Sequence, residues 1–405
     1  MAINKIKNVI SEVVSGAGTY LASPYFNLAT VNTSNLSLSQ KFAKLNWLLI
    51  ALITLLASIG FIMLYSAGGG SFRPWLVRQL GFFILFFPVM IIIALSSLRL
   101  WLNFSYLIYF CALSLVIIVD IMGHNAMGAT RWFRIGALTI QPSEIMKIST
   151  VFALARYFYR IDASDVSKIR FLIVPVLLIA IPCFFIFHQP DLGTATILLL
   201  VGVFVLFLAG VNLKYFILSG IAILITIPFA WNLLYDYQKQ RVLTFINPHN
   251  DPLGSGYNII QSTIAIGSGG LFGKGLLKGT QGQLDFLPEK QTDFIFTMLC
   301  EELGFVGAVF TIVVYFLIIL LCIRIANKTQ HQFGRILTMG VASIFFIHMF
   351  INMGMVMVLI PVVGAPLPFV SYGGTIMASM MIGFGIVLNV DLNPNFNEKG
   401  YRKLI

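Results

Sequence analysis

The chain has 405 residues, of which 58% are hydrophobic and only 10% are charged, and its formal net charge is +11. Soluble domains carry roughly a quarter charged residues, so this composition excludes an ordinary soluble protein and indicates an integral membrane protein. The basic residues are dispersed between apolar runs, and we therefore expect no nucleic-acid partner. The short alternating segments of a transmembrane β-barrel are absent, so we expect an all-α polytopic fold.

Ten apolar runs are long enough to cross about 30 Å of hydrocarbon as helices. We expect these spans at 45–66, 77–97, 102–122, 141–159, 171–188, 192–211, 215–234, 293–324, 335–359 and 373–390. Because the eighth run is longer than a bilayer requires, it must tilt, bend or project outward, and Gly304 and Gly307 are the positions where we expect a bend or close helix packing. The predicted organisation is an N-terminal extension (1–44) without signal-peptide features, a ten-helix membrane domain (45–390) and a C-terminal tail (391–405).

The long connection between the seventh and eighth spans, residues 235–292, has Ile and Leu spaced among glycines. We expect it to pack on the membrane surface as a short amphipathic or re-entrant helix. Lysine and arginine indicate the side on which it lies, because cytoplasmic connections are enriched in both. That rule places both termini in the cytoplasm and the long connection outside. The basic residues on the predicted cytoplasmic side are Lys5, Lys7, Lys41, Lys44, Arg156, Arg160, Lys168, Arg170, Arg324, Lys328, Arg335, Lys399, Arg402 and Lys403.

Cysteine and histidine give no sign of a disulfide framework or a metal centre. The cysteines lie within or at the ends of apolar runs, far apart in sequence, and we expect them to be small core residues. The histidines are equally scattered, so the sequence does not predict a histidine metal site. The four cysteines are Cys111, Cys183, Cys300 and Cys322.

Residues 282–304 carry several carboxylates at the mouth of the eighth span. An ionised side chain near hydrocarbon is costly unless it is paired, hydrated or functional. Asp293 at the start of the apolar run is either a helix-capping acid or a general base at a membrane cavity. Asp285 and Glu289 precede it at intervals of four, but Pro288 argues against one continuous helix. For Glu301 and Glu302, deeper in the span, we expect an ion pair or hydrogen-bond network.

A second group of charged residues lies at the fourth span. Glu144 and Lys147 are three residues apart in QPSEIMK and therefore share a helix face. They either form a buried pair that holds helices together, or Lys147 faces a cavity and binds an anionic head group. Arg131 in GATRWF suits a phosphate contact or an interfacial anchor. Asp191 in HQPDLGTA is expected to be a helix cap, and Ser371 a loop or capping residue rather than a nucleophile.

Five motifs occur in one order along nearly the whole chain: GATRWF with QPSEIMK, HQPDLGTA, DPLGSGY with QSTIAIGSGG, LPEKQTDFIF with EELGFVG, and PLPFVSYGG. This set resembles the SEDS family (shape, elongation, division and sporulation) of bacterial cell-wall proteins. The segment KGTQGQLDFLPE is more similar to the RodA branch of that family than to the FtsW branch. Residues 1–40 lie outside the resemblance.

The resemblance implies a ten-helix peptidoglycan glycosyltransferase of the bacterial inner membrane, with its active site on the periplasmic face. Such an enzyme polymerises lipid II into glycan strands for cell elongation and rod shape. It would work with a class B penicillin-binding protein and the elongation machinery. The acid of the TDFIF motif, here Asp293, is implied to be essential, and Glu144 and Lys147 to be functionally important.

The expected reaction is an inverting glycosyl transfer with Asp293 as general base. The candidates for substrate and diphosphate binding are Arg131, Glu144, Lys147, Arg241, Lys274 and Glu289. A divalent cation, Mg²⁺ or Mn²⁺, is an alternative source of positive charge, with ligands that the sequence does not identify. Two other functions stay open: a transporter that flips a lipid-linked precursor, which intramembrane acids and broken helices also fit, and a non-catalytic scaffold for a penicillin-binding protein.

Overall fold

The computed structural model describes residues 37–122, 124–126, 129–135, 138–162, 164–233, 236–248 and 256–396. Most of the predicted N-terminal extension and of the C-terminal tail lies outside these residues. The first described helix, α2 (Leu38–Ala43), lies within the predicted extension.

Ten helices coincide with the ten predicted spans. By length and hydropathy, seven of the helices in the described ranges can cross a membrane (α3, α4, α5, α7, α13, α14 and α15), while α8 and the first part of α9 are shorter apolar helices. The predicted all-α polytopic membrane fold is confirmed. The ten helices are α3 (Trp47–Ala67), α4 (Trp75–Leu95), α5 (Leu98–Met122), α6 (Pro142–Tyr159), α7 (Ile169–His188), α8 (Leu192–Leu208), α9 (Leu213–Leu233), α13 (Ile295–Lys328), α14 (Gln332–Val356) and α15 (Gly374–Leu392).

The helix ends differ from the predicted ones by a few residues, for local reasons. α14 begins three residues earlier than expected because His331 caps it, its Nδ1 accepting from the Gly334 N–H at 2.9 Å. α8 begins where predicted because Asp191 is its N-cap and accepts from the Thr194 N–H at 3.2 Å. The predicted cap at Asp191 is therefore confirmed.

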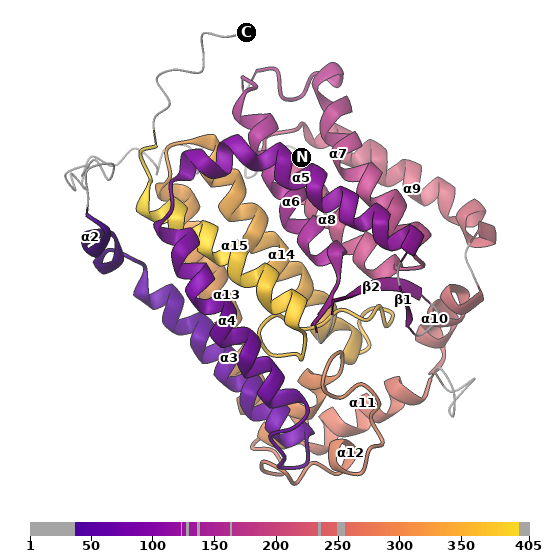
Figure 1. Cartoon of the computed structure of the whole chain (residues 1–405). Helices are drawn as coiled ribbons and strands as arrows, with labels where there is room; N and C mark the ends of the chain where they lie inside the picture. Colours follow the sequence, from indigo (N-terminus) through magenta and orange to yellow (C-terminus); the bar gives the residue numbers. More distant parts are fainter. Residues whose placement is uncertain are drawn as a thin grey trace, which may run out of the picture. The chain divides into compact units, whose positions relative to one another are not determined.

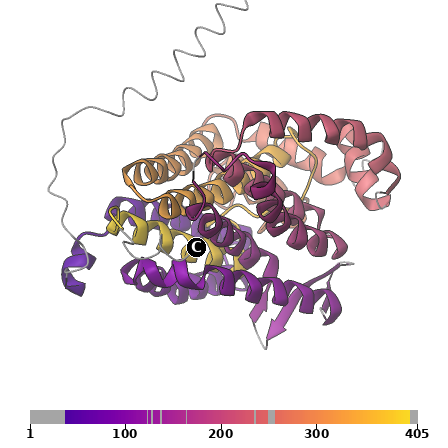
Figure 2. The same cartoon turned by 90° about the horizontal axis from the view of Figure 1, so that it is seen from above.

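α14 and α15, together with α6, lie at the centre of the bundle. In their most apolar windows, α14 is 78% buried and α15 is 83% buried, whereas the corresponding windows of α4 and α7 are each 22% buried. α14 contacts α6, α8, α13 and α15, and α15 also packs on α4. Figures 1 and 2 show α3 and α4 on one side of this centre and α9 on the other. Polar residues on α14 are therefore placed where several helices meet.

A small antiparallel sheet, which we did not predict, fills the connection between α5 and α6. Its strands are β1 (His124–Ala126), β2 (Ala129–Ile135) and β3 (Leu138–Ile140), in the order β1-β2-β3. Phe133 pairs with Ile140, and Thr139 O accepts from Thr375 Oγ1 at 3.2 Å. The sheet thus connects to the first turn of α15.

The long connection is helical rather than extended. It contains α10 (Asp236–Ile246), α11 (Tyr257–Ser268) and α12 (Thr280–Gln283). The sequence predicted one short helix here, and the described part of the connection has three. α11 contacts α13 and α14, so this connection packs against the helices that follow it.

The predicted bend in α13 lies at Gly304, where φ is 68° and ψ is −165°. The kink frees backbone groups that the loop before α12 satisfies, as buried backbone polar groups require. Four hydrogen bonds join them: Phe305 N to Gly270 O, Val306 N to Leu271 O, Lys274 N to Glu301 O, and Gly275 N to Glu302 O.

The carboxylates of Glu301 and Glu302 hold the same loop. Glu301 Oε1 accepts from Lys274 Nζ at 2.8 Å and from the Gln281 N–H at 3.1 Å. Glu302 Oε1 accepts from Ser66 Oγ at 2.6 Å, which ties α13 to α3. The predicted hydrogen-bond network for these two acids is confirmed.

Substitution of Gly304 by alanine is expected to destabilise the protein by at least about 1–3 kcal/mol, because only glycine adopts this backbone region without strain. A Cβ at this position would also lie 2.2 Å from Gly273 N. Thermal unfolding in detergent measures the effect. Gly81→Ala in α4 is the matched control, because nothing in the described part of the chain lies within 4 Å of a Cβ there. Equal melting temperatures for the two variants would contradict the conclusion that the kink requires glycine at residue 304.

Candidate active site

Asp293 lies in the turn that precedes α13, one residue before the N-cap residue Phe294. It is half-buried. Its backbone carbonyl accepts from Asn352 Nδ2 at 2.9 Å. Its carboxylate lies beside Gly364, since a Cβ built on that glycine would be 3.3 Å from Asp293 Oδ2. The acid therefore stands between α14 and the loop that joins α14 to α15.

Residues 361–373 of that loop, called the loop 361–373 below, hold the segment that carries Asp293 by hydrogen bonds. Ser371 Oγ donates to Thr292 O at 2.6 Å, and Tyr372 N donates to Gln291 O at 2.8 Å. Ser371 Oγ also accepts from the Leu367 N–H at 2.7 Å, so Ser371 is a loop residue, as predicted, and its hydroxyl holds the loop together. Three consecutive backbone carbonyls, those of residues 291, 292 and 293, are thus fixed by hydrogen bonds from α14 and this loop.

Asp285 and Glu289 do not share a helix face with Asp293. Both have left-handed backbone angles, with φ of 57° and 53°, so the segment is a series of turns, as Pro288 suggested. Asp285 pairs with Lys290 at 2.6 Å. Glu289 is exposed, and its Oε2 accepts from Thr292 Oγ1 at 3.0 Å. Glu289 therefore lies at the exposed edge of the turns, four residues before Asp293 in the chain.

Glu144 and Lys147 form the predicted ion pair on α6, with Lys147 Nζ 2.6 Å from Glu144 Oε1. The Lys147 side chain is fully buried. Its ammonium also lies 2.5 Å from His348 Nε2 on α14. On the other side of that ring, His348 Nδ1 is 3.2 Å from Pro366 O in the loop 361–373. The pair is thereby connected to the loop that holds Asp293.

His348 and Asn352 were not among the predicted site residues, although both lie in the site. Each is completely buried. They are four residues apart in a strongly apolar span, so they share one helix face. Polar side chains inside a membrane span mark function or essential packing. That spacing is the signal from which the sequence could have identified them.

The other predicted basic residues are less closely joined to Asp293. Lys274 Nζ is 2.8 Å from Glu301 Oε1 and 2.8 Å from Thr280 Oγ1, and its side chain is 28% exposed. Arg131 lies in β2 and Arg241 in α10; their side chains are outside the described residues. The structure therefore brings together Asp293, Glu289 and, through α14, Glu144 and Lys147.

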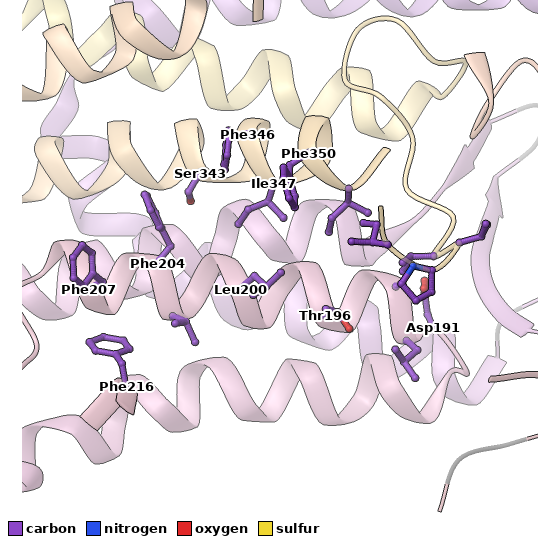
Figure 3. Close-up of a pocket in the computed structure, with 18 of the residues that line it drawn as sticks. Asp191, Thr196, Leu200, Phe204, Phe207, Phe216, Ser343, Phe346, Ile347 and Phe350 are labelled. Atoms are coloured by element: carbon purple, nitrogen blue, oxygen red, sulfur yellow. The ribbon is translucent and has the colours of Figure 1, made fainter. Parts of the chain in front are cut away.

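A large apolar cavity opens between α8, α9, α14 and the start of the loop 361–373, with a volume of about 870 Å³. Figure 3 shows Leu200, Phe204 and Phe207 of α8 along it, with Phe346 and Phe350 of α14 above and Asp191 at one end. That end is also lined by residues 360–363, which immediately precede Gly364. A largely apolar cavity with a polar end suits a ligand with a long apolar tail and a polar head.

No group of three or more His, Cys, Asp and Glu side chains lies close enough together to hold a metal ion among residues that the structure describes. These residues thus provide no complete protein cage for a cation. Mg²⁺ is commonly held by only one or two carboxylates together with substrate phosphates, an arrangement that would depend on bound substrate.

Comparisons with known proteins give one consistent result. The profile of the FtsW, RodA and SpoVE family, described as "Cell cycle protein", matches residues 46–395. The chain is 41% identical to peptidoglycan glycosyltransferase MrdB of Escherichia coli strain K12 over 356 residues, covering 87% of this chain and 94% of the relative. It is 36% identical to stage V sporulation protein E of Bacillus subtilis strain 168 over 363 residues, covering 85% of this chain and 96% of the relative.

Solved structures agree with this result. One, from a study of how a peptidoglycan synthase complex coordinates polymerization and crosslinking, superposes with a TM-score of 0.76 at 30% identity, covering 87% of this chain and 99% of the other. The rod shape determining protein RodA of Thermus thermophilus superposes with a TM-score of 0.65 at 26% identity, with the same coverage. The predicted resemblance is confirmed: the chain belongs to the SEDS family of FtsW, RodA and SpoVE proteins.

Proposed function

We propose that this protein is a peptidoglycan glycosyltransferase that polymerises lipid II into glycan strands for cell elongation and rod shape. The names of the curated relatives support the activity, since MrdB is a peptidoglycan glycosyltransferase and is 41% identical over most of both chains. The observation that carries the proposal in this chain is the fixed position of Asp293. Its backbone carbonyl accepts a hydrogen bond from Asn352, and its half-buried carboxylate lies beside Gly364, which directly follows the residues 360–363 that line the large apolar cavity.

In the proposed reaction, Asp293 takes a proton from the acceptor sugar hydroxyl. The hydroxyl oxygen then forms a bond to the anomeric carbon of the donor, and the bond between that carbon and the lipid diphosphate breaks. Attack opposite to the leaving group inverts the anomeric centre. Positioning of the two sugars and neutralisation of the departing diphosphate are expected to supply most of the rate acceleration.

The apolar cavity is the proposed site for part of the substrate's lipid chain. Its walls on α8 and α14 are aromatic and aliphatic, and its end at Asp191 is also lined by residues 361–363, which precede the Gly364 that borders the Asp293 carboxylate. A lipid-linked sugar can thus place its chain in the membrane and its head group at Asp293. This continuity supports a lipid-linked substrate over a soluble sugar donor.

Positive charge for the diphosphate is proposed to come from Arg131, Arg241 or Lys274, or from a divalent cation, Mg²⁺ or Mn²⁺, held largely by substrate oxygens. Lys274 is partly exposed but already paired with Glu301. Glu289 is proposed to contact the substrate from the turn before Asp293.

The expected cellular setting is the bacterial inner membrane, with both termini in the cytoplasm and Asp293 on the periplasmic face. The positive-inside distribution of Lys and Arg supports this orientation. A class B penicillin-binding protein is the proposed partner, together with the elongation machinery. The similarity to a structure from a peptidoglycan synthase complex that couples polymerization to crosslinking supports such a partnership.

Purified protein and its transpeptidase partner are expected to convert lipid II into glycan chains in detergent, where no sealed membrane exists. Gel separation of labelled products measures chain formation. The partner alone is the control for contaminating polymerase. A transporter or a scaffold makes no chains under these conditions, so the absence of product with correctly folded protein would overturn the proposal in favour of one of those two functions.

A further inference from the structure

Four buried polar residues connect α6 to Asp293 across the centre of the bundle. They are Glu144 and Lys147 on α6, and His348 and Asn352 on α14, and we refer to them as the polar link. Glu144 is 4% exposed and the other three are 0% exposed. Burial of polar groups is costly unless hydrogen bonds compensate for it. The hydrogen-bond partners of these four side chains therefore indicate what the polar link does.

His348 connects an ammonium group to a backbone carbonyl. A carbonyl oxygen only accepts hydrogen bonds, so His348 Nδ1, 3.2 Å from Pro366 O, carries the ring hydrogen. Nε2 then presents its lone pair to Lys147 Nζ, 2.5 Å away. This assignment follows from the identity of the two partners. His348 is therefore a neutral imidazole that donates its Nδ1 hydrogen to the loop, while Lys147 contacts Nε2 on the other side of the ring.

Asn352 makes the second connection, one helical turn further along α14. Its Nδ2 donates to Ala365 O at 2.7 Å and to Asp293 O at 2.9 Å. One amide group thus joins the loop 361–373 directly to the residue proposed as the base. His348 fixes Pro366, and Asn352 fixes the residue before it.

The loop position sets the space around the Asp293 carboxylate. Gly364 precedes the two fixed residues, has a φ of 76°, and lies so close that a Cβ would be 3.3 Å from Asp293 Oδ2. A shift of the Ala365 and Pro366 carbonyls would therefore move Gly364 relative to that carboxylate. Misplacement of a reacting group by about 1 Å can reduce a rate about 100-fold.

We propose that His348 and Asn352 are positioning residues: they transmit the fixed geometry of the Glu144 and Lys147 pair to the loop 361–373, and so hold the Asp293 carboxylate in its reactive position. The inference rests on the proposed function. It assigns Lys147 a role within the protein rather than a contact with substrate, and it predicts effects on kcat more than on KM.

Two pairs of variants test the proposal in the complex with the transpeptidase partner, using lipid II in detergent. His348→Asn keeps an amide donor near the Nδ1 position but cannot reach Lys147, whereas His348→Gln reaches Lys147 but places no donor at Nδ1. We expect kcat to fall less than about 10-fold for His348→Asn and about 100-fold for His348→Gln, with KM within about threefold of the wild type. If His348 only filled space, glutamine, which is closer in size, would be the better replacement.

The second pair examines the amide. Asn352→Asp preserves shape but replaces the donor by an acceptor that faces two carbonyls, and we expect kcat to fall about 100-fold. Thr338→Val is the control, because Thr338 is a buried residue of α14 whose hydroxyl has no hydrogen-bond partner among the residues that the structure describes. It should retain wild-type kcat and melting temperature. Size-exclusion profiles and thermal unfolding show whether each variant folds. If Asn352→Asp does not fold, the comparison of His348→Asn with His348→Gln tests the positioning role.

The outcomes separate this proposal from the proposed function. If the wild type polymerises lipid II but Asn352→Asp or His348→Gln retains wild-type kcat, the positioning role is wrong and the enzyme assignment stands. An increase in KM with unchanged kcat, or equal effects of the two histidine variants, would also overturn the positioning role. If the folded wild type makes no glycan, the proposed function itself fails.

Discussion

Asp293→Asn is expected to lower kcat for lipid II polymerisation about 10²- to 10⁴-fold, the range by which general bases accelerate reactions, with little change in KM. The substitution removes the proton acceptor but preserves the size of the side chain. It also leaves intact the hydrogen bond from Asn352, which is made to the backbone carbonyl of residue 293. The loss therefore reports on chemistry rather than on folding.

Matched controls come from the same segment. Asp285→Asn and Glu289→Gln change acids that lie in the turns before Asp293, one paired with Lys290 and the other bonded to Thr292. We expect Asp285→Asn to stay within about threefold of wild-type kcat and Glu289→Gln to alter mainly KM, in line with its proposed contact with substrate. Polymerisation by folded Asp293→Asn at a rate near the wild type would exclude Asp293 as the base.

Gly364→Ala tests the position of the Asp293 carboxylate independently, because it adds a methyl group 3.3 Å from Asp293 Oδ2 without altering a titratable group. It also strains a position with φ of 76°. Its effect on kcat should therefore resemble that of the positioning variants more than that of Asp293→Asn. The comparison separates loss of the base from displacement of the base.

Much of the fold was predictable because each membrane span can be recognised from a local property of the sequence, an apolar run of sufficient length. All ten runs became helices, and the kink at Gly304 was anticipated from glycine in an overlong span. The sheet between α5 and α6 was missed because β1 and β3 have three residues each, too few to display an alternating pattern. The turns at Asp285 and Glu289 likewise depend on tertiary contacts of the loop.

The site was predictable only in part, for a reason of distance along the chain. Asp293 stands out locally, as an acid at the mouth of an apolar run, and its motif resembled that of a known family. The contact between Lys147 and His348 joins residues 201 positions apart, and no local pattern specifies it. Sequence reasoning could recognise that Glu144 and Lys147 neutralise each other, but not that the pair is connected to Asp293 through α14.

A large effect on stability is expected at the buried ion pair of Glu144 and Lys147. Lys147→Met should destabilise the protein by about 3–5 kcal/mol, because it leaves the Glu144 carboxylate buried without its cation. Adding Glu144→Gln removes that unpaired charge, so the double variant should recover most of the lost stability. Lys328→Met is the control, since Lys328 pairs with Asp391 at a position where its side chain is 60% exposed, and such surface pairs contribute about 1 kcal/mol or less.

Stability and activity should separate in the double variant. Without the Lys147 ammonium, His348 Nε2 loses its donor, and the ring loses the contact that orients it toward Pro366 O. We therefore expect kcat to stay below the wild-type value, by a factor similar to that of His348→Asn, although the melting temperature recovers. If Lys147 instead binds an anionic head group, the double variant should show a raised KM. Recovery of both stability and wild-type kcat would mean that the pair only holds α6 in place, and the connection from α6 through His348 to Asp293 would then have no part in catalysis.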